Sequence, residues 1–286
     1  MDKSILGDIS AKLSLSIKGM EPVSGGDIND THVLDCGEVK LFLKSHLAAG
    51  RADMFSKELK GLELLRSAGA VRVPRPLLND KSGDMIYLVM EFIEKAAVQP
   101  RTWNDFGEQL AALHRCTAPL FGLDHDNYIG SLPQLNKQAQ DWASFYAAHR
   151  ILPLVAKAFD EHKLGPADIT AAEKLCNRLS ELFPPEPPAL LHGDLWSGNY
   201  LVAGGGEPVI FDPAVYYGHR EMDLGMSLLF GGFQPQFYES YKNAWPPEPG
   251  WRKRTELTQL YPLLVHLLLF GGHYYQDVRT TIRKYS

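Results

Sequence analysis

A short hairpin flanked by polar residues constrains this chain more than any other part of its sequence. Residues 192–199 read His-Gly-Asp-Leu-Trp-Ser-Gly-Asn and lead into a strand-like segment, 200–202. After a triple glycine, a second strand-like segment, 208–211, runs directly into Asp212. In an antiparallel hairpin the start of one strand lies beside the end of the other. We therefore expect Asn199 and Asp212 to emerge side by side.

These polar residue types suit phosphoryl transfer. One amide and one carboxylate supply hard oxygen ligands for Mg²⁺, which takes its remaining ligands from water and substrate phosphates. Asp194 precedes Asn199 by five positions on the same loop, within reach of a substrate hydroxyl in line with such a phosphate. The sequence thus predicts Asp194 as the catalytic base and Asn199 and Asp212 as metal ligands.

The order of these residues is similar to the catalytic loop and metal-binding Asp of the protein-kinase-like fold. Within its small-molecule branch, the stretches 192–199, 212–224 and 228–233 resemble the fructosamine kinase (ketosamine-3-kinase) family. The opening at 24–29 and the tail at 260–267 also resemble it, so the likeness runs over essentially the whole chain. It implies an α+β, bilobal fold with a small antiparallel-sheet N-terminal lobe containing one helix and a larger, mostly helical C-terminal lobe.

The first ninety residues carry strand patterns with one helical pattern between them. Strands are expected at 13–20, 31–35 and 39–44. Apolar residues at helical spacing predict a helix over 51–68, and the apolar run 85–93 predicts a buried strand. We place the lobe boundary in the irregular stretch 94–102, which gives an ATP-binding lobe at 1–93 and a catalytic lobe at 94–286.

Beyond that boundary the pattern is helical apart from the hairpin. Helices are expected at 106–115, 142–159, 169–183, 224–230 and 257–275. The most apolar stretch, 263–272, is far shorter than the ~20 residues that a membrane span requires. No membrane partner is therefore expected.

The remaining parts of an ATP site fall in the first lobe. Gly25 and Gly26 form a turn between strands that lets the backbone approach phosphates. Lys44 projects from one face of its strand and would hold the α and β phosphates of ATP, while Glu58 on the following helix would orient it. The resemblance also implies a hinge for adenine at Met90, Glu91 and Phe92, and a structural role for Asp223 beneath the catalytic loop.

The acceptor follows from the resemblance alone. It implies a ketosamine, a fructosamine or ribulosamine adduct of an amine, free or bound to protein, phosphorylated at the sugar 3-hydroxyl in a deglycation reaction. Trp196 offers a flat face to the sugar ring, although a tryptophan read in isolation is more typical of a core. His219 and Glu221 lie in the family's most distinctive segment, and a carboxylate there would meet the cationic amine of the substrate.

Composition limits the partners and the compartment. Lys plus Arg total 29 and Asp plus Glu total 34, a net charge of −5, which argues against nucleic acid as a partner. The three cysteines are an odd number and are not spaced as a metal cluster, which indicates reduced thiols and a cytoplasmic protein. The sequence does not determine the oligomeric state.

Two other functions remain open on the sequence. The same fold could act on a different hydroxyl acceptor, such as choline, homoserine or an aminoglycoside. A nucleotide-binding regulator that has lost catalysis would be expected to lack Lys44, Asp194 or Asn199, and all three are present. Asp212 and Asp223 are only 11 positions apart, which leaves no room for a peptide-binding activation segment.

Overall fold

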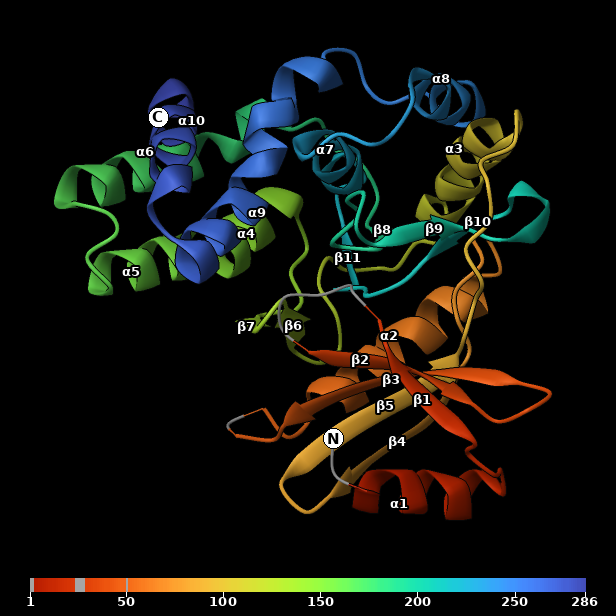
Figure 1. Cartoon of the computed structure of the whole chain (residues 1–286). Helices are drawn as coiled ribbons and strands as arrows, with labels where there is room; N and C mark the ends of the chain where they lie inside the picture. The colour runs from red at the N-terminus through yellow and green to blue at the C-terminus, as the bar shows by residue number, and fades with distance from the viewer. Residues whose placement is uncertain (1–2, 24–28, 50) are drawn as a thin grey trace.

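The N-terminal part is built on an antiparallel sheet that is covered on both faces. The computed structural model describes residues 3–23, 29–49 and 51–286. The strands lie in the order β1-β2-β3-β5-β4. The elements of this part are α1 (Lys3–Leu13), β1 (Gly19–Pro22), β2 (Asp30–Asp35), β3 (Lys40–Leu47), α2 (Met54–Ala68), β4 (Pro76–Ser82) and β5 (Met85–Glu91). Figure 1 shows α1 and α2 on opposite faces of the sheet.

The apolar strand β5 is buried from both sides, which explains its unbroken run of apolar residues. Ile86, Leu88 and Met90 pack into the core that contains α2. Tyr87 and Val89, which alternate with them, pack into the core that contains α1. The position of β5 inside the sheet is therefore fixed by apolar burial on two faces.

The expected strand at 13–20 is wrong over most of its length. Helix α1 extends to Leu13, and strand β1 begins only at Gly19. Ile5 and Ile9, one helical turn apart, are completely buried against the sheet, so α1 is stabilised by packing. The alternating apolar residues that suggested a strand, among them Leu15, pack on the same core from the connecting segment.

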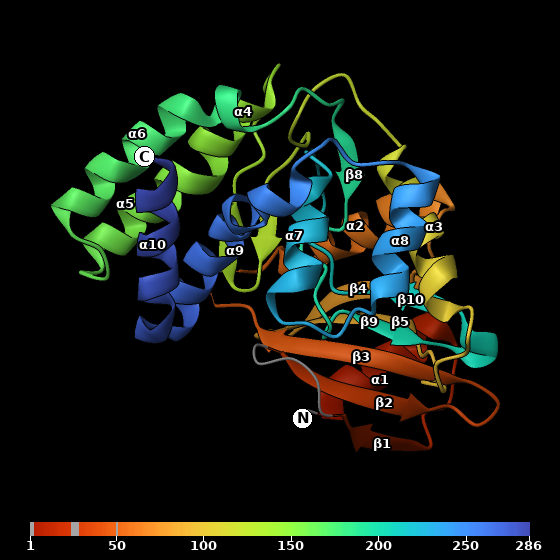
Figure 2. The ribbon, with the colours of Figure 1, turned by 90° about the horizontal axis from the view of Figure 1, so that it is seen from above.

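The C-terminal part is mostly helical, as expected. Its helices are α3 (Thr102–His114), α4 (Trp142–Tyr146), α5 (Leu152–Asp160), α6 (Pro166–Leu182), α7 (Glu221–Leu229), α8 (Pro235–Ala244), α9 (Thr255–Phe270) and α10 (Tyr275–Tyr285). Seen from above, α9, α7, α8 and α3 stand in a row (Figure 2). Among the residues that the structure describes, no helix is both long and apolar enough to cross a membrane.

Two helix predictions differ from the structure in detail. A π-helical turn, Ala147–Ile151, joins α4 to α5 and interrupts the expected helix 142–159. The expected helix 257–275 ends at Phe270, where Gly271 adopts a positive φ of 94°. Helix α8 was not expected at all. It packs against α3 at Gly107, where a Cβ would lie 2.3 Å from the carbonyl oxygen of Phe237.

Short paired strands position the polar loop between the two parts. They are β6 (Asn127–Ile129), β7 (Leu132–Gln134), β8 (Ala189–Leu191), β9 (Tyr200–Val202), β10 (Pro208–Ile210) and β11 (Tyr216–Gly218). Strand β9 pairs with β10 as the expected hairpin, and β8 pairs with β11. In Figure 1 the strands β8 to β11 lie between the C-terminal helices and the part that contains α2 and the sheet.

Candidate active site

The loop that carries Asp194 is held by one buried carboxylate. This loop connects β8 to β9, and the backbone N–H groups of His192 and Gly193 donate to the two oxygens of Asp223, at 2.8 and 2.9 Å. Asp223 lies in the first turn of α7 and is 1% exposed. Two hydrogen bonds to one carboxylate fix the direction of the loop backbone.

Asp223 is itself oriented by a buried histidine. His114 on α3 donates from Nε2 to Asp223 at 3.2 Å, and its Nδ1 accepts from the hydroxyl of Tyr241 at 2.7 Å. Burial alone would raise the pKa of Asp223, but the hydrogen bonds from His114 and from the loop outweigh it and hold this pKa below its usual value. The carboxylate is therefore ionised when it receives the loop N–H groups.

Gly193 is required by the close approach of two chain segments. Its φ is +84°, in the left-handed region that favours glycine. A Cβ at this position would lie 2.0 Å from the carbonyl oxygen of Ala214. The backbone N–H of Ala214 in turn donates to the carbonyl of His192 at 2.9 Å. The loop and the segment after the hairpin are thus locked together.

Asp194 is held by the amide of Asn199. The Nδ2 group of Asn199 donates to both the backbone carbonyl and the carboxylate Oδ2 of Asp194, each at 2.9 Å. Burial raises the pKa of Asp194 to about 7, against the opposing effect of the Asn199 hydrogen bond. A carboxylate with such a pKa is a stronger base than an exposed aspartate, which suits proton removal from a hydroxyl.

The hairpin brings Asn199 and Asp212 to the same end. Tyr200 faces Ile210 in the last ladder pair, and the next N–H, that of Phe211, donates to the carbonyl of Asn199 at 3.0 Å. Asp212 follows immediately with a φ of +56°, a rare conformation for a residue other than glycine. This turn directs the chain away from the hairpin at the residue that the sequence marks as a metal ligand.

Lys44 joins the two parts of the molecule at this point. Its Nζ lies 2.8 Å from Oε1 of Glu58 on α2 and 2.7 Å from Oδ1 of Asp212. The Lys44 side chain is only 4% exposed. Burial by itself would lower the pKa of Lys44, but the two carboxylates outweigh burial and hold it above its usual value. Lys44 is therefore charged at neutral pH.

These residues line one cavity of about 460 Å³. Lys44 and Glu58 come from the sheet side, and Asp194, Asn199 and Asp212 come from the loop and hairpin. The volume is in the range of small-molecule binding sites. The structure thus brings together five residues that the sequence analysis assigned to phosphate, metal and proton chemistry.

The residues present fit a magnesium ion bound with substrate. Within the described part of the chain, Oδ1 of Asn199 and Oδ2 of Asp212 take no part in the hydrogen bonds above, so each remains available as a ligand. The same residues include no group of three or more His, Cys, Asp or Glu side chains placed to hold a metal ion by themselves. Such a site suits Mg²⁺, which keeps water and phosphate ligands.

Met90, Glu91 and Phe92, the expected adenine hinge, are not among the described residues that line this cavity. Gly25 and Gly26 fall outside the described residues. Met90 and Glu91 end strand β5, where the N–H of Glu91 donates to Arg75 at 2.8 Å. Phe92 begins the connection to α3, and the Nζ of Lys40 lies 6.0 Å from its ring centre. The structure therefore places the expected hinge where the sheet ends.

Trp196 is the one expected substrate residue that lines the cavity among those described. Its ring meets that of Phe230, with the centroids 5.7 Å apart and the rings edge to face. Gly198 leaves space for the Trp196 ring, because a Cβ there would lie 2.3 Å from it. The tryptophan is thus part of the cavity wall beside Asp194.

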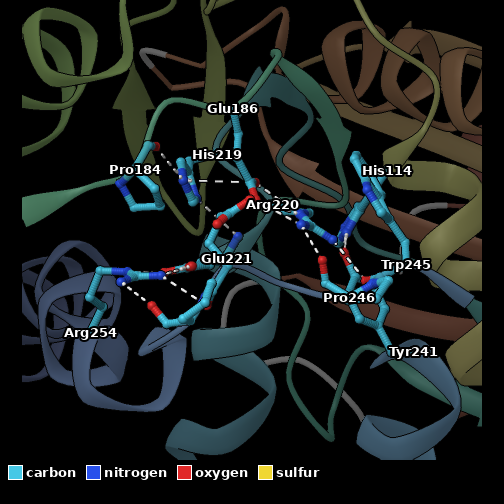
Figure 3. A network of polar contacts seen from close by, with 12 residues as sticks. His114, Pro184, Glu186, His219, Arg220, Glu221, Tyr241, Trp245, Pro246 and Arg254 are labelled. Atoms are coloured by element: carbon cyan, nitrogen blue, oxygen red, sulfur yellow. Dashed lines mark hydrogen bonds and ion pairs between the residues drawn. The ribbon is translucent and has the colours of Figure 1, made fainter. Parts of the chain in front are cut away.

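His219 and Glu221 do not have the surroundings expected for substrate contacts. His219 is completely buried, and its ring donates to the carbonyl of Pro184 at 3.3 Å. Glu221 is 1% exposed and forms an ion pair with Arg254 at 2.5 Å. Figure 3 shows both within a buried polar network. The cation that Glu221 meets is therefore Arg254 of the same chain, and not the amine of a substrate as the sequence led us to expect.

At the centre of this network is a residue that no pattern in the sequence marks. Arg220, 2% exposed, makes two parallel hydrogen bonds to Glu186, and the same guanidinium stacks 3.9 Å from the ring centre of Trp245 (Figure 3). The partners are 34 positions apart, so no local pattern connects them. The distinctive segment around 219–221 therefore anchors the start of α7 rather than the substrate.

Comparisons with known proteins agree with this geometry. The family model for fructosamine kinase matches residues 1–286. The chain belongs to the fructosamine kinase family. This membership makes it an ATP-dependent phosphotransferase with a protein-kinase-like fold.

Relatives of this fructosamine kinase family member span nearly all of the chain. A protein from Synechocystis sp. called "Probable ketoamine kinase" is 40% identical over 94% of this chain and 90% of its own length. The chloroplastic protein-ribulosamine 3-kinase of Arabidopsis thaliana is 36% identical over 92% of this chain and 81% of its own length. A solved structure from Thermobifida fusca, whose description names fructosamine-3-kinase, has a TM-score of 0.88 at 33% identity and covers 99% of this chain and 98% of its own.

Proposed function

We propose that this chain transfers the γ-phosphoryl group of ATP to the 3-hydroxyl of a ketosamine sugar, the reaction that starts removal of sugars from glycated amines. One observation carries the proposal: Lys44, Asp194, Asn199 and Asp212 line the same cavity, and Lys44 bridges its two sides through Asp212. Family membership supplies the class of reaction, and the names of the relatives supply the acceptor.

Each cavity residue has a role in this reaction. Lys44, held by Glu58, binds the α and β phosphates as a fixed positive charge. Asn199 and Asp212 would hold Mg²⁺, which supplies charge neutralisation along the triphosphate. Asp194 accepts the proton from the attacking hydroxyl. Backbone groups at Met90 to Phe92, which are not among the described residues that line the cavity, would contact the adenine.

Catalysis in this scheme rests on alignment. The transferred phosphoryl group passes through a loose transition state, which leaves little covalent chemistry for the protein. The Asn199 hydrogen bonds fix the Asp194 carboxylate before substrate arrives, and the Asp223 hydrogen bonds fix the loop. Because these contacts are already formed, little reorganisation is needed when charge develops. Trp196 forms the wall against which the sugar ring packs.

The test is a turnover assay with ribulose-lysine and fructose-lysine side by side. We expect Mg²⁺-dependent ADP formation and a product phosphorylated at O3, identified by NMR. Asp194→Asn retains an oxygen for Asn199 and should lower kcat by roughly 10²–10⁴-fold while leaving ATP binding intact. Choline, homoserine and an aminoglycoside serve as competing acceptors. Turnover of one of these without turnover of either ketosamine would refute the proposal.

A further inference from the structure

A continuous run of aromatic rings forms the cavity wall beside Asp194. The rings come from the catalytic loop, the end of α7, helix α9 and the turn after it. Centroids of neighbouring rings are 5.0 to 5.7 Å apart, and His266 contacts three of the others. We call them the aromatic group: Trp196, Phe230, His266, Phe270 and Tyr274.

Two phenylalanine rings of the aromatic group are exposed to solvent, although burial of such apolar side chains is favourable. Phe230 is 39% exposed and Phe270 is 47% exposed, and both line the cavity. Isolated exposed apolar side chains are common, but a cluster of them beside a reactive carboxylate indicates a surface that a ligand covers. Phe230 follows helix α7 and Phe270 ends helix α9, both in the C-terminal part, whereas Lys44 belongs to strand β3 of the sheet.

The charge distribution of the cavity narrows the class of ligand. Among the described residues that line it, the acidic side chains are Glu58, Asp194 and Asp212. Glu58 and Asp212 both pair with Lys44 at the phosphate end, where its single positive charge offsets one of their two negative charges. Apart from Asp194, where the sugar hydroxyl would lie, no described carboxylate lines the cavity outside the pairs with Lys44, so a positively charged group of the acceptor would meet the rings.

The tautomer of His266 adds a hydrogen-bond acceptor to this wall. Its Nδ1 lies 2.7 Å from the carbonyl oxygen of Pro262. A carbonyl can only accept, so Nδ1 carries the hydrogen and Nε2 carries the lone pair. Burial lowers the pKa of His266, which keeps the ring in this neutral form at pH 7. A neutral imidazole can accept from an N–H group without repelling a cation.

We propose that the aromatic group binds the protonated secondary amine of the ketosamine, with the amine against the ring faces while the sugar hydroxyl lies at Asp194. Ammonium groups are attracted to the negative faces of aromatic rings within about 6 Å. This inference rests on the proposed function. It adds that the enzyme selects its acceptor by the positive charge of the amine. It assigns to Phe230, His266 and Phe270 the role that the sequence analysis gave to Glu221.

The experiment compares two acceptors that differ in charge. One is the ketosamine of butylamine, whose nitrogen is protonated at neutral pH, and the other is its N-acetyl derivative, whose nitrogen is a neutral amide. Steady-state kcat and KM are measured for both, and where the amide is not phosphorylated its inhibition constant against the cationic compound is used. The wild-type protein should favour the cationic acceptor by at least about tenfold.

Three variants test the rings and one controls for surface effects. Phe270→Leu and Phe230→Leu keep apolar volume but remove the ring face, and each should raise KM for the cationic acceptor by roughly 3- to 30-fold. His266→Phe keeps a ring and removes the acceptor nitrogen, with a similar expected rise. Phe159→Leu on α5 changes a ring of comparable exposure, 37%, outside the lining of this cavity as far as the structure describes it, and should change nothing.

The outcomes separate this inference from the proposed function. A rise in KM for the cationic acceptor alone, with kcat and the KM for ATP unchanged, supports the inference. Equal weakening of cationic and neutral compounds, or no weakening in either leucine variant, overturns it, because the rings would then serve only as apolar surface or not contact the acceptor. Wild-type protein that phosphorylates no ketosamine refutes the proposed function itself, and this inference with it.

Discussion

The Nζ of Lys44 and Oδ1 of Asp212 are 2.7 Å apart although 168 positions separate the two residues. One belongs to the central sheet and the other to the end of the β9–β10 hairpin. The contact therefore defines how the two parts of the molecule meet at the cavity. Glu58 contacts the same ammonium group. The Lys44 side chain is therefore held between two carboxylates in a single orientation.

Lys44→Met should abolish most activity while the protein stays folded. The variant removes the charge that binds phosphate, and loss of one preorganised electrostatic contact lowers kcat by roughly 10²–10³-fold. Burial raises the pKa of Glu58, so this carboxyl can protonate when Lys44 is absent, which limits the loss of stability. The check is kcat together with the thermal midpoint, and Lys60→Met on the exposed side of α2 is the control. Normal turnover in Lys44→Met would exclude a phosphate-binding role.

Gly193→Ala should disrupt the catalytic loop. The added Cβ would lie 2.0 Å from the carbonyl of Ala214, and the residue has a φ of +84°. We expect a loss of about 1–3 kcal/mol in the free energy of unfolding and a large fall in kcat, because the loop must move. Gly204→Ala in the hairpin turn, where nothing lies within 4 Å of the new Cβ, is the matched control. Equal changes in stability and kcat in the two variants would contradict the close packing of the loop against Ala214.

Glu186→Gln should be strongly destabilising for a residue remote from the cavity. It leaves the guanidinium of Arg220, 2% exposed, without its carboxylate. Removing one member of a buried ion pair costs about 3–5 kcal/mol. Urea denaturation measures the effect, and Glu256→Gln, which breaks the exposed pair with Lys284, should cost less than ~1 kcal/mol. Comparable losses of unfolding free energy in the two variants would show that the buried ion pair stabilises the protein no more than the exposed one.

The folded protein should lose stability as the pH falls below 6.5. Burial lowers the pKa of His192, His219 and His266 below their usual value of 6.5. Between 6.5 and the lower folded pKa values, the unfolded chain binds protons that the folded chain does not. The contribution of these histidines to stability is therefore complete above pH 6.5 and falls on acidification, by at most ~1.4 kcal/mol per pH unit for each group.

Urea denaturation at pH 7.5 and pH 5.5 tests this prediction. The three buried histidines together should lower the free energy of unfolding by about 2–3 kcal/mol at the acidic pH. Asp194, whose pKa burial raises to about 7, offsets part of this loss because its carboxyl binds a proton in the folded protein over the same range. His219→Gln should show a smaller difference between the two pH values, whereas His162→Gln, at an exposed position, should behave like the wild type. An equal pH dependence in the wild type and in His219→Gln would disprove the assignment of a neutral, buried His219.

The residues whose placement depends on local geometry could be predicted from the sequence. Strand alternation put Lys44 on the face opposite to Leu41 and Leu43, and the structure has those two in the α1 core while Lys44 contacts Glu58 on α2. Antiparallel pairing put Asn199 beside Asp212, and the hydrogen bond from Phe211 to Asn199 places them at the same hairpin end. Their catalytic roles remain predictions.

The errors arise where distant residues decide the outcome. The segment around Leu13 alternates like a strand, but tertiary packing of Ile5 and Ile9 makes α1 helical. Helix α8 lies in a region bordered by glycine and proline, and its contact with Gly107 cannot be seen locally. The distinctive motif around Glu221 predicts a substrate ligand. Its actual partner, Arg254, is 33 positions away, so no local pattern reveals the pair.

The segment from Asp212 to Asp223 has a consequence for control of the enzyme. It is folded into β11 and the start of α7, with Val215, Tyr216 and Arg220 buried. In signalling kinases the equivalent stretch is a loop that phosphorylation orders, and ordering it assembles the site. Here the stretch is already packed, and the Lys44–Glu58 pair is already formed. The rate of ketosamine phosphorylation would then follow the amount of enzyme and the supply of acceptor, with no signal needed to assemble the site.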